Sequence, residues 1–295
     1  MSLRLAVATE DFGTSLKKAI GQASACQVDG VRLNTRSELN VLNSSESANR
    51  QILLYIKERQ MRTAGLICPT RHALYDEEHI EPRLEIIRKS MSLVRQFETD
   101  TLLVRCGHIP DPDADNEAKP ESTHIDDQTN PFSFANPIVR ASASEADKFS
   151  MLCEILNDLC KHGNHIGCTI NLQLAAYDQR LAKRLLDSVK TGPLKIAYDS
   201  ATAVMTGASV EGTYRDLYSQ IGYVRARDAV HNLDGAGIEV DVGAGVVDWI
   251  QFFPTLLEAG YRGWICVERT GGDSRAEDVT RGVSYLKSLI PQTGD

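Results

Sequence analysis

The segment GYVRARDAVHN, residues 222–232, places two arginines, an aspartate and a histidine within seven residues: Arg225, Arg227, Asp228 and His231. The mixture of β-branched, aromatic and polar residues at its start predicts a strand that ends in this charged group. A guanidinium binds carboxylates and phosphates through paired hydrogen bonds, while aspartate and histidine can exchange protons. The segment therefore predicts a site for an anionic ligand or a centre for proton transfer.

Other apolar, β-branched runs also end in polar residues that could take part in chemistry. These residues are Arg36, Arg71, Arg105, His108, Gln173, Asp199 and Glu268. We interpret Arg36, Arg71, Arg105 and Arg227 as contacts for a phosphate or carboxylate group of the substrate, because the planar guanidinium matches both anions. His108, Asp228 and His231 are added to this substrate-binding set as helpers. For each single arginine a surface ion pair, and for each single histidine a structural or solvated position, stays open as the alternative.

Eight short apolar runs alternate with segments of helical periodicity, a pattern typical of repeated strand-then-helix units. The predicted strands are residues 3–9, 30–34, 63–70, 101–107, 167–174, 194–200, 223–228 and 263–268. Eight such units in 295 residues favour a (β/α)8 TIM barrel, in the α/β class, as one domain over residues 1–295. In this fold the residues at the carboxyl ends of the strands meet at one mouth, which is where chemistry collects.

Three helices are the clearest. They are residues 81–98, residues 144–163 with Ser144 as N-cap and Gly163 at the carboxyl stop, and residues 246–260. Pro254 is expected to kink the last helix or split it in two.

Residues 108–137 interrupt the alternation after the fourth strand with a polar, acidic, proline-rich insertion. Its DPDADN sequence is similar to the start of a calcium loop, but the glycine at position six is missing and Ser122 stands at position twelve. A flexible lid over the mouth or a disordered loop is therefore favoured over calcium binding.

Composition limits the partners. The net charge of −8 disfavours nucleic acid and anionic membranes, so a small molecule is the expected partner, while a homo-oligomer stays open. Neither a leader nor an apolar run of about 20 residues is present, which predicts a cytoplasmic protein.

The seven cysteines contain no C-x-x-C pair, so neither disulfides nor a structural zinc site are expected. Cys68 lies near Arg71 but has no evident histidine partner that would make it a nucleophile.

The second half of the chain resembles a known family. LKIAYDSATAVMTGASVEGTYRDLYSQIGYVRARDA and DVGAGVVDWIQFFPTLLEAGYRGWICVE are similar to segments of the xylose isomerase-like TIM barrels, which include sugar phosphate isomerases and epimerases and endonuclease-IV-like proteins. The second segment is the more specific, with its G-x-G turn, helix, GY-x-G and closing strand that ends in a glutamate. The resemblance implies an isomerase or epimerase of sugars or sugar phosphates.

The same resemblance implies a divalent metal, Mn, Mg, Co or Zn, held by a Glu, an Asp, a His and a Glu from strands five to eight. Here Asp199 and Glu268 match the Asp and the last Glu, whereas Gln173 replaces the first Glu and Arg225 replaces the His. Two of the four expected ligands are thus replaced. If a metal is bound, Asp199 and Glu268 are the residues left to hold it.

Arg225 decides how this site is interpreted. A guanidinium cannot ligate a cation, and at roughly 4 Å it would repel a divalent ion by about 8 kcal/mol at an effective dielectric near 20. We therefore expect a metal-free site without a cofactor, in which Arg225 takes the place of the metal and pairs with Asp199 and Glu268, and Gln173 supplies a neutral amide. Glu268 would be the single general base.

Two functions stay open. The first is an isomerase or epimerase that acts on a small anionic carbohydrate derivative with Glu268, Arg225, Asp199 and Gln173 as its catalytic residues. The second is a catalytically degenerate TIM-barrel binding protein. Cleavage of abasic DNA is disfavoured, because it needs several metals and because the acidic chain would repel a duplex.

Overall fold

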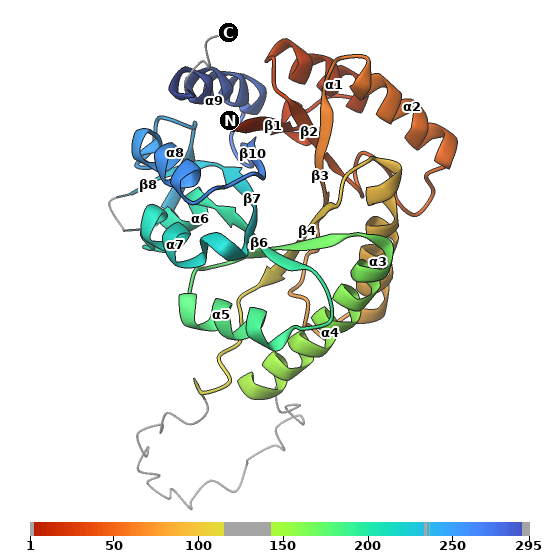
Figure 1. Cartoon of the computed structure of the whole chain (residues 1–295), viewed down its shortest axis with the longest axis vertical. Coiled ribbons are helices and arrows are strands. Elements are labelled where there is room, and N and C mark those ends of the chain that lie inside the picture. The colour runs from red at the N-terminus through yellow and green to blue at the C-terminus, as the bar shows by residue number, and fades with distance from the viewer. Residues whose placement is uncertain (1–2, 115–142, 233–234, 236, 291–295) are drawn as a thin grey trace, which may run out of the picture.

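The structure is a computed structural model that describes residues 3–114, 143–232, 235 and 237–290. Eight parallel strands close into a barrel in the order β1-β10-β7-β6-β5-β4-β3-β2 (Figure 1). Their bounds are β1 Arg4–Ala8, β2 Gly30–Asn34, β3 Arg62–Cys68, β4 Thr101–Gly107, β5 Thr169–Leu174, β6 Leu194–Asp199, β7 Ile221–Ala226 and β10 Trp264–Val267. The predicted TIM barrel is confirmed, and each predicted strand corresponds to one of these eight.

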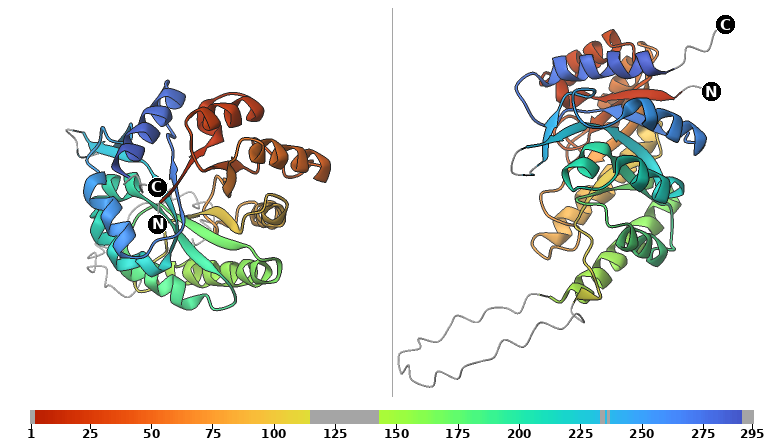
Figure 2. Two further views of the ribbon diagram at one scale, coloured as in Figure 1. Left: turned by 45° about the horizontal axis from the view of Figure 1, so that its top comes forward. Right: turned by 90° about the vertical axis from the view of Figure 1, so that its left-hand side faces the viewer.

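Helices surround the barrel, as the view along its axis shows (Figure 2, left). The bounds are α1 Leu16–Ala25, α2 Glu46–Lys57, α3 Ile80–Gln96, α4 Glu145–Ile166, α5 Gln179–Ser188, α6 Ser200–Met205, α7 Val210–Leu217, α8 Trp249–Glu258 and α9 Arg275–Leu289, with short 3-10 turns η1 Thr9–Phe12 and η3 Tyr218–Gln220. Among the described residues, no helix combines the length and the apolar character needed to cross a bilayer.

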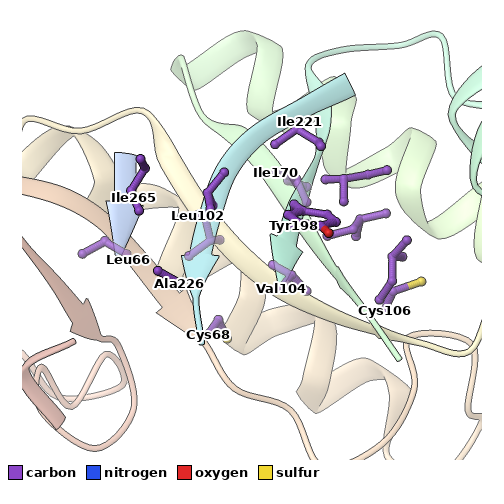
Figure 3. Packing of buried hydrophobic residues seen from close by; sticks show 14 of the residues in the cluster. Leu66, Cys68, Leu102, Val104, Cys106, Ile170, Tyr198, Ile221, Ala226 and Ile265 are labelled. Carbon is purple, nitrogen blue, oxygen red and sulfur yellow. The ribbon is translucent and has the colours of Figure 1, made fainter. Parts of the chain in front are cut away.

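Two hydrophobic layers hold the barrel together. The outward side chains of the strands, among them Leu66, Leu102 and Ile170, are fully buried in the larger cluster, which also takes in side chains of the helices (Figure 3). A smaller cluster fills the barrel interior with small side chains such as Ala6 and Ala197 and two large rings, Tyr223 and Trp264. Burial of this apolar surface is the main stabilising term of such a fold.

Two helix ends differ from the predicted ones. Helix α4 begins after the expected N-cap, since Ser144 Oγ accepts a hydrogen bond from Asp147 N, but it does not stop at Gly163. That glycine lies inside the helix, where a Cβ would approach Cys168 O to 2.5 Å. The helix ends instead at Gly167, whose φ of 72° is the left-handed conformation that glycine adopts without strain.

Helix α8 is shorter than predicted and is one helix. It begins at Trp249, with Asp248 as its N-cap, and Pro254 lies inside it without splitting it. The pyrrolidine ring is exposed, so the backbone bond that proline cannot make is lost on the solvent side of the helix.

A hairpin that the sequence analysis missed follows β7 directly. Strands β8 Asp228–His231 and β9 Gly237–Val240 pair antiparallel outside the barrel. Strand β7 therefore ends at Ala226 and not at Asp228 as predicted. Of the insertion predicted over residues 108–137, residues 108–114 are described and the remainder lies outside the described residues. Asp111 pairs with Arg180, and Asp113 pairs with Arg184 at 2.5 Å, so this described part is tied to α5.

Candidate active site at the carboxyl mouth of the barrel

Three of the predicted catalytic residues lie on neighbouring strands at the carboxyl mouth. Asp199 ends β6 and pairs in register with Arg225 of β7, and Glu268 follows the last residue of β10. Ala197, Tyr223 and Cys266, two residues earlier on the same strands, belong to the interior cluster. Because side chains alternate along a strand, the three charged side chains also face the interior.

Arg225 holds the two carboxylates together. Its Nη1 donates to Asp199 Oδ2 at 2.7 Å, and its Nη2 and Nε donate to Glu268 Oε2 at 2.7 and 2.9 Å. The predicted pairing of Arg225 with Asp199 and Glu268 is confirmed. Glu268 has no exposed side-chain surface, and Arg225 retains 12%.

Arg227 extends the pairing on one side. Its Nη1 donates to Asp199 Oδ2 at 2.7 Å, its Nε to Glu239 Oε1 at 2.9 Å and its Nη2 to Thr270 Oγ1 at 2.9 Å. All three nitrogens are thus bound to protein groups. This arrangement differs from the predicted role of Arg227 as an anion contact, because its fork is used to hold the hairpin and the loop after β10 against the barrel.

Arg32 extends the pairing on the other side. This interior residue of β2 is 2% exposed, and its Nη2 donates to Glu10 Oε1 at 2.9 Å while its Nε lies 3.4 Å from Glu268 Oε1. The second contact is close enough for charge attraction, but neither atom makes a hydrogen bond in the described part of the chain.

Together these residues form one continuous row of alternating charge, which we call the charge chain: Glu10, Arg32, Glu268, Arg225, Asp199, Arg227 and Glu239. Four carboxylates and three guanidiniums give it a net charge of −1, and each guanidinium bridges two carboxylates. Buried charges are tolerable only when they are compensated in this way.

The compensation sets the protonation states. Burial alone would raise the pKa of Glu268, but Arg225 and Arg32 outweigh it and hold that pKa below its usual range. Burial is likewise outweighed at Asp199, where Arg227 and Arg225 lower the pKa. Both carboxyl groups are therefore ionised at neutral pH.

Asp11 behaves in the opposite way. Burial, followed by the negative charge of Glu268, raises its pKa to about 7, although Arg32 and the backbone N–H of Arg269 act against the rise. The Arg269 N–H donates to Asp11 Oδ2 at 2.9 Å. Asp11 is thus a buried carboxyl group beside the charge chain that changes its protonation state near neutral pH.

Three buried polar atoms of the charge chain make no hydrogen bond within the described residues: Arg32 Nε, Arg32 Nη1 and Glu268 Oε1. Buried donors and acceptors without partners are costly, so such groups mark a place where a ligand or solvent is expected to bind. The side of Glu268 that faces Arg32 can therefore take part in chemistry while Arg225 fixes the other oxygen.

Three predicted anion contacts lie at the carboxyl ends of consecutive strands: Arg36 follows β2, Arg71 follows β3 and Arg105 lies near the end of β4. Arg36, Arg71 and Arg105 are all exposed. Arg36 donates to Pro69 O at 3.0 Å and Arg105 to Arg71 O at 3.5 Å. Within the described residues none of the three pairs with a carboxylate, so their charges are available to an anionic ligand.

Gln173 lies at the same level of the barrel. It belongs to β5, is half-buried and pairs in register with Arg105 of β4. Its amide makes no hydrogen bond to Arg225, Asp199 or Glu268 in the part of the chain that is described. The structure therefore places Gln173 near the mouth but does not join it to the charge chain.

Asp228, a residue of the predicted substrate-binding set, lies outside the barrel mouth and binds other parts of the protein. The buried carboxylate of Asp228 accepts hydrogen bonds from Gly243 N and Val247 N and from Trp249 Nε1, at 3.0 to 3.1 Å. It holds the hairpin and the start of α8, and this role follows from the turn of the chain at Arg227, which takes Asp228 out of the barrel.

His231 and His108 are both exposed. His231 ends β8 and lines a separate hollow of about 580 Å³ with Glu211 and Asp248. The hairpin thus carries it away from the barrel axis, in contrast to the predicted role at the mouth.

The residues at the charge chain do not fit a divalent metal. A metal that used Asp199 Oδ2 and Glu268 Oε2 would need the position where Arg225 donates three hydrogen bonds to those oxygens. A guanidinium and a metal ion cannot share these lone pairs, since both are cations.

The one group of three metal-ligating side chains found among the described residues lies elsewhere, in the segment between β3 and α3. His72, Asp76 and Glu78 bring one ligand atom each within 4.8 Å of one another. His72 Nδ1 lies 3.0 Å from Asp76 Oδ2, and the three residues are partly or largely exposed.

Three members of the charge chain had no role predicted for them from the sequence, although Glu10 stands among the polar residues at the predicted strand ends. Glu10 continues the inward-facing positions of β1 toward the mouth, and Arg32 occupies an inward-facing position of β2. The alternation of residues around Arg32 in GVRLN could therefore have indicated that its side chain faces the barrel interior. Glu239 lies in GIEV, an alternating segment that also signals a strand.

The family is shown by sequence. The family model of the xylose isomerase-like TIM barrels matches residues 20–289, and the chain belongs to this family. No curated protein matches the chain in sequence.

Solved structures share the fold over nearly the whole chain. The xylose isomerase domain protein from Planctomyces limnophilus has a TM-score of 0.74 at 15% identity, with 98% of each chain covered. A 3-keto-D-glucoside 4-epimerase from E. coli has a TM-score of 0.71 at 13% identity, over 97% of this chain and 99% of that one. A D-allulose 3-epimerase from Methylomonas sp. in complex with D-allulose has a TM-score of 0.67 at 14% identity, over 98% and 97%. At such identities the likeness is one of fold.

Proposed function

We propose that this chain is a sugar or sugar phosphate isomerase or epimerase that acts, without a metal, on a small anionic carbohydrate derivative at the carboxyl mouth. The observation that carries the proposal is the state of Glu268: Arg225 fixes Oε2, while Oε1 is ionised and makes no hydrogen bond within the described residues. A carboxylate base with one oxygen held by hydrogen bonds, and the other only facing Arg32 Nε at 3.4 Å, is positioned for proton transfer.

The anionic part of the substrate is assigned to Arg36, Arg71 and Arg105. They lie on the β2, β3 and β4 side of the mouth, whereas Asp199, Arg225 and Glu268 lie on the β6, β7 and β10 side. A phosphate or carboxylate bound by the free arginines would leave the rest of the molecule over the charge chain.

In the proposed reaction Glu268 Oε1 takes the proton from the carbon next to the substrate carbonyl. The electron pair left behind forms an enediolate, whose oxygens Arg225 and Arg32 stabilise by charge. The same carboxylate returns the proton to the neighbouring carbon, and a hydroxyl proton passes between the two oxygens, so the product has the same atoms as the substrate. Because Gln173 offers no second base, isomerisation on one face is favoured over two-base epimerisation.

One observation favours the second candidate, a TIM-barrel binding protein without catalysis. Arg225 and Arg32 lower the pKa of Glu268, and a carboxylate with a lowered pKa is a weak base. In that case the arginines would bind the ligand and no proton would be exchanged.

Deuterium exchange separates the two candidates. The protein is incubated in D2O with a panel of ketoses, aldoses and their phosphates, and mass spectrometry follows deuterium on the substrate carbons. We expect incorporation for at least one anionic member, its loss in Glu268→Gln and its retention in Glu277→Gln, a control at an exposed glutamate of α9. Binding of the panel without any incorporation would favour the binding protein instead.

Metal content is tested separately. Elemental analysis after purification is expected to find well below one divalent ion per chain, and exchange is expected to survive dialysis against EDTA. A tightly held ion that is lost in Asp199→Asn would overturn the metal-free site.

A further inference from the structure

The opposite, amino-terminal mouth of the barrel contains a hollow of about 1,060 Å³ that is open to solvent. It is lined by the starts of strands and the segments before them, including Arg4, Arg62, Asn171, Gly222, Arg262 and Trp264. Its size is that of a small-molecule pocket, which typically measures about 300 to 1,000 Å³. None of its residues belongs to the charge chain.

The residues that line this hollow carry a net positive charge, in contrast to the chain as a whole. Four cationic side chains, Arg4, Lys57, Arg62 and Arg262, face two carboxylates, which gives +2 in a chain whose net charge is −8. Lys57 is the one of the four that pairs with a carboxylate in the described part of the chain, at 2.5 Å from Glu98 Oε1. Three guanidiniums are therefore left without a counter-charge.

One of these guanidiniums is held in place by an aromatic ring. The guanidinium carbon of Arg4 lies 4.5 Å from the ring centroid of Trp264, and Arg4 also donates to Arg262 O. Arg62 is exposed, and its guanidinium makes no hydrogen bond or ion pair with any described residue. Arg262 Nη1 donates to Tyr261 O at 3.1 Å. The rim thus combines two guanidiniums held by hydrogen bonds with the free one of Arg62.

The floor of the hollow carries buried oxygens that lack partners. Asn171 is 1% exposed and Thr63 is 5% exposed, and neither Asn171 Oδ1 nor Thr63 Oγ1 makes a hydrogen bond within the described residues. A Cβ at Gly222 would approach Asn171 Oδ1 to 2.3 Å, so the glycine leaves room for that amide on the barrel axis. Buried acceptors of this kind suit the hydroxyl groups of a ligand.

We propose that the amino-terminal mouth is a second ligand site, which takes a small molecule with one anionic group and one or more hydroxyl groups. The anionic group binds at Arg4, Arg62 and Arg262, and the hydroxyl groups reach Asn171 Oδ1 and Thr63 Oγ1. This site is independent of the proposed reaction, because the two mouths share no residue.

Calorimetric titration with glycerol 3-phosphate and with inorganic phosphate, at low ionic strength, tests the site. We expect glycerol 3-phosphate to bind, and Arg62→Gln to weaken both probes about tenfold, as the loss of a charge-assisted contact predicts. Asn171→Leu, which removes the acceptor at nearly constant volume, should weaken glycerol 3-phosphate alone. The control Arg50→Gln, at an exposed arginine of α2, should change neither affinity.

Three other outcomes of these titrations would each contradict one part of the proposed second site. If neither probe binds, or if binding is unchanged in Arg62→Gln, the hollow is not an anion site. If affinity is lost in Arg36→Gln and kept in Arg62→Gln, the anion belongs to the carboxyl mouth, and the outcome concerns the proposed function alone. If Asn171→Leu affects both probes equally or neither, the floor does not bind hydroxyl groups.

Discussion

The interior of the carboxyl mouth and the rim of the amino-terminal mouth differ in how they accommodate arginine. Inside the carboxyl mouth Arg32 and Arg227 are buried and Arg225 is mostly buried, and each of the three bridges two carboxylates. At the amino-terminal mouth Arg4, Arg62 and Arg262 pair with no carboxylate of the described chain.

The difference follows from burial. The charge of a guanidinium inside the barrel must be compensated by nearby carboxylates, whereas the charge of one at an open rim is solvated by water. The paired arginines inside the carboxyl mouth are therefore part of the framework, whereas unpaired arginines at an open rim, such as those of the amino-terminal mouth, are available for binding. Substitutions at the two ends should accordingly differ in stability and in salt dependence.

The largest effect is expected for Arg225→Leu. It leaves the carboxylates of Asp199 and Glu268 buried without their shared partner, and removal of one member of a buried pair costs about 3 to 5 kcal/mol. Urea unfolding followed by circular dichroism measures the change in the free energy of unfolding.

A double variant checks the cause. Arg225→Leu combined with Glu268→Gln should recover part of the lost stability, because one of the two stranded charges is removed. If the double variant is as unstable as the sum of the two single variants, the loss reflects packing and not charge.

An intermediate effect that depends on pH is expected for Asp11→Asn. The folded pKa of Asp11 is raised from 3.8 to about 7. Between about pH 4 and pH 7 the unfolded chain releases this proton while the folded chain keeps it, so the stability contributed by this group falls as the pH rises and is constant above pH 7. Because asparagine does not titrate, the variant should gain stability relative to the parent over this range, by up to about 4 kcal/mol.

Unfolding curves at pH 5 and pH 8 measure the gain. Asp199 and Glu268 have lowered pKa values, so their contributions are lost as the pH falls below the usual carboxyl range and do not overlap with this window. A stability difference that does not change between the two pH values would contradict the raised pKa.

The smallest effect is expected for Arg62→Gln at the amino-terminal mouth. This side chain is exposed and unpaired, so the free energy of unfolding should change by less than about 0.5 kcal/mol. A destabilisation comparable to that of Arg225→Leu would remove the distinction between the two mouths.

Much of the fold could be predicted because the strands are short β-branched runs between helices. Strand β2, Gly30–Asn34, coincides with its prediction, and the end of each strand indicated which side chains meet at the mouth. The pairing of Arg225 with Asp199 and Glu268 was predicted from the resemblance to the family, which places the three residues at positions of one metal site, together with the charges of their side chains.

The hairpin could not be predicted from the same rules. A strand was expected to continue through Asp228, but the chain turns at Arg227 and starts an antiparallel pair outside the barrel. That turn changes the roles of Asp228, His231 and Glu239, since one position in the chain decides which of them face the barrel. The amino-terminal mouth was missed because its residues lie at the starts of the strands and in the segments before them, where no motif marks them.

Glu239, carried by the hairpin, has a consequence for how a molecule could enter the carboxyl mouth. Its carboxylate accepts from Arg227 Nε, from Thr270 N at 2.9 Å and from Gly271 N at 3.1 Å, and also binds the Thr270 hydroxyl. Several hydrogen bonds to the one carboxylate of Glu239 thereby hold the hairpin against the loop after β10. Access along this side requires these contacts to break together, so the side of β2 to β4, where the exposed and unpaired arginines stand, is the less costly route.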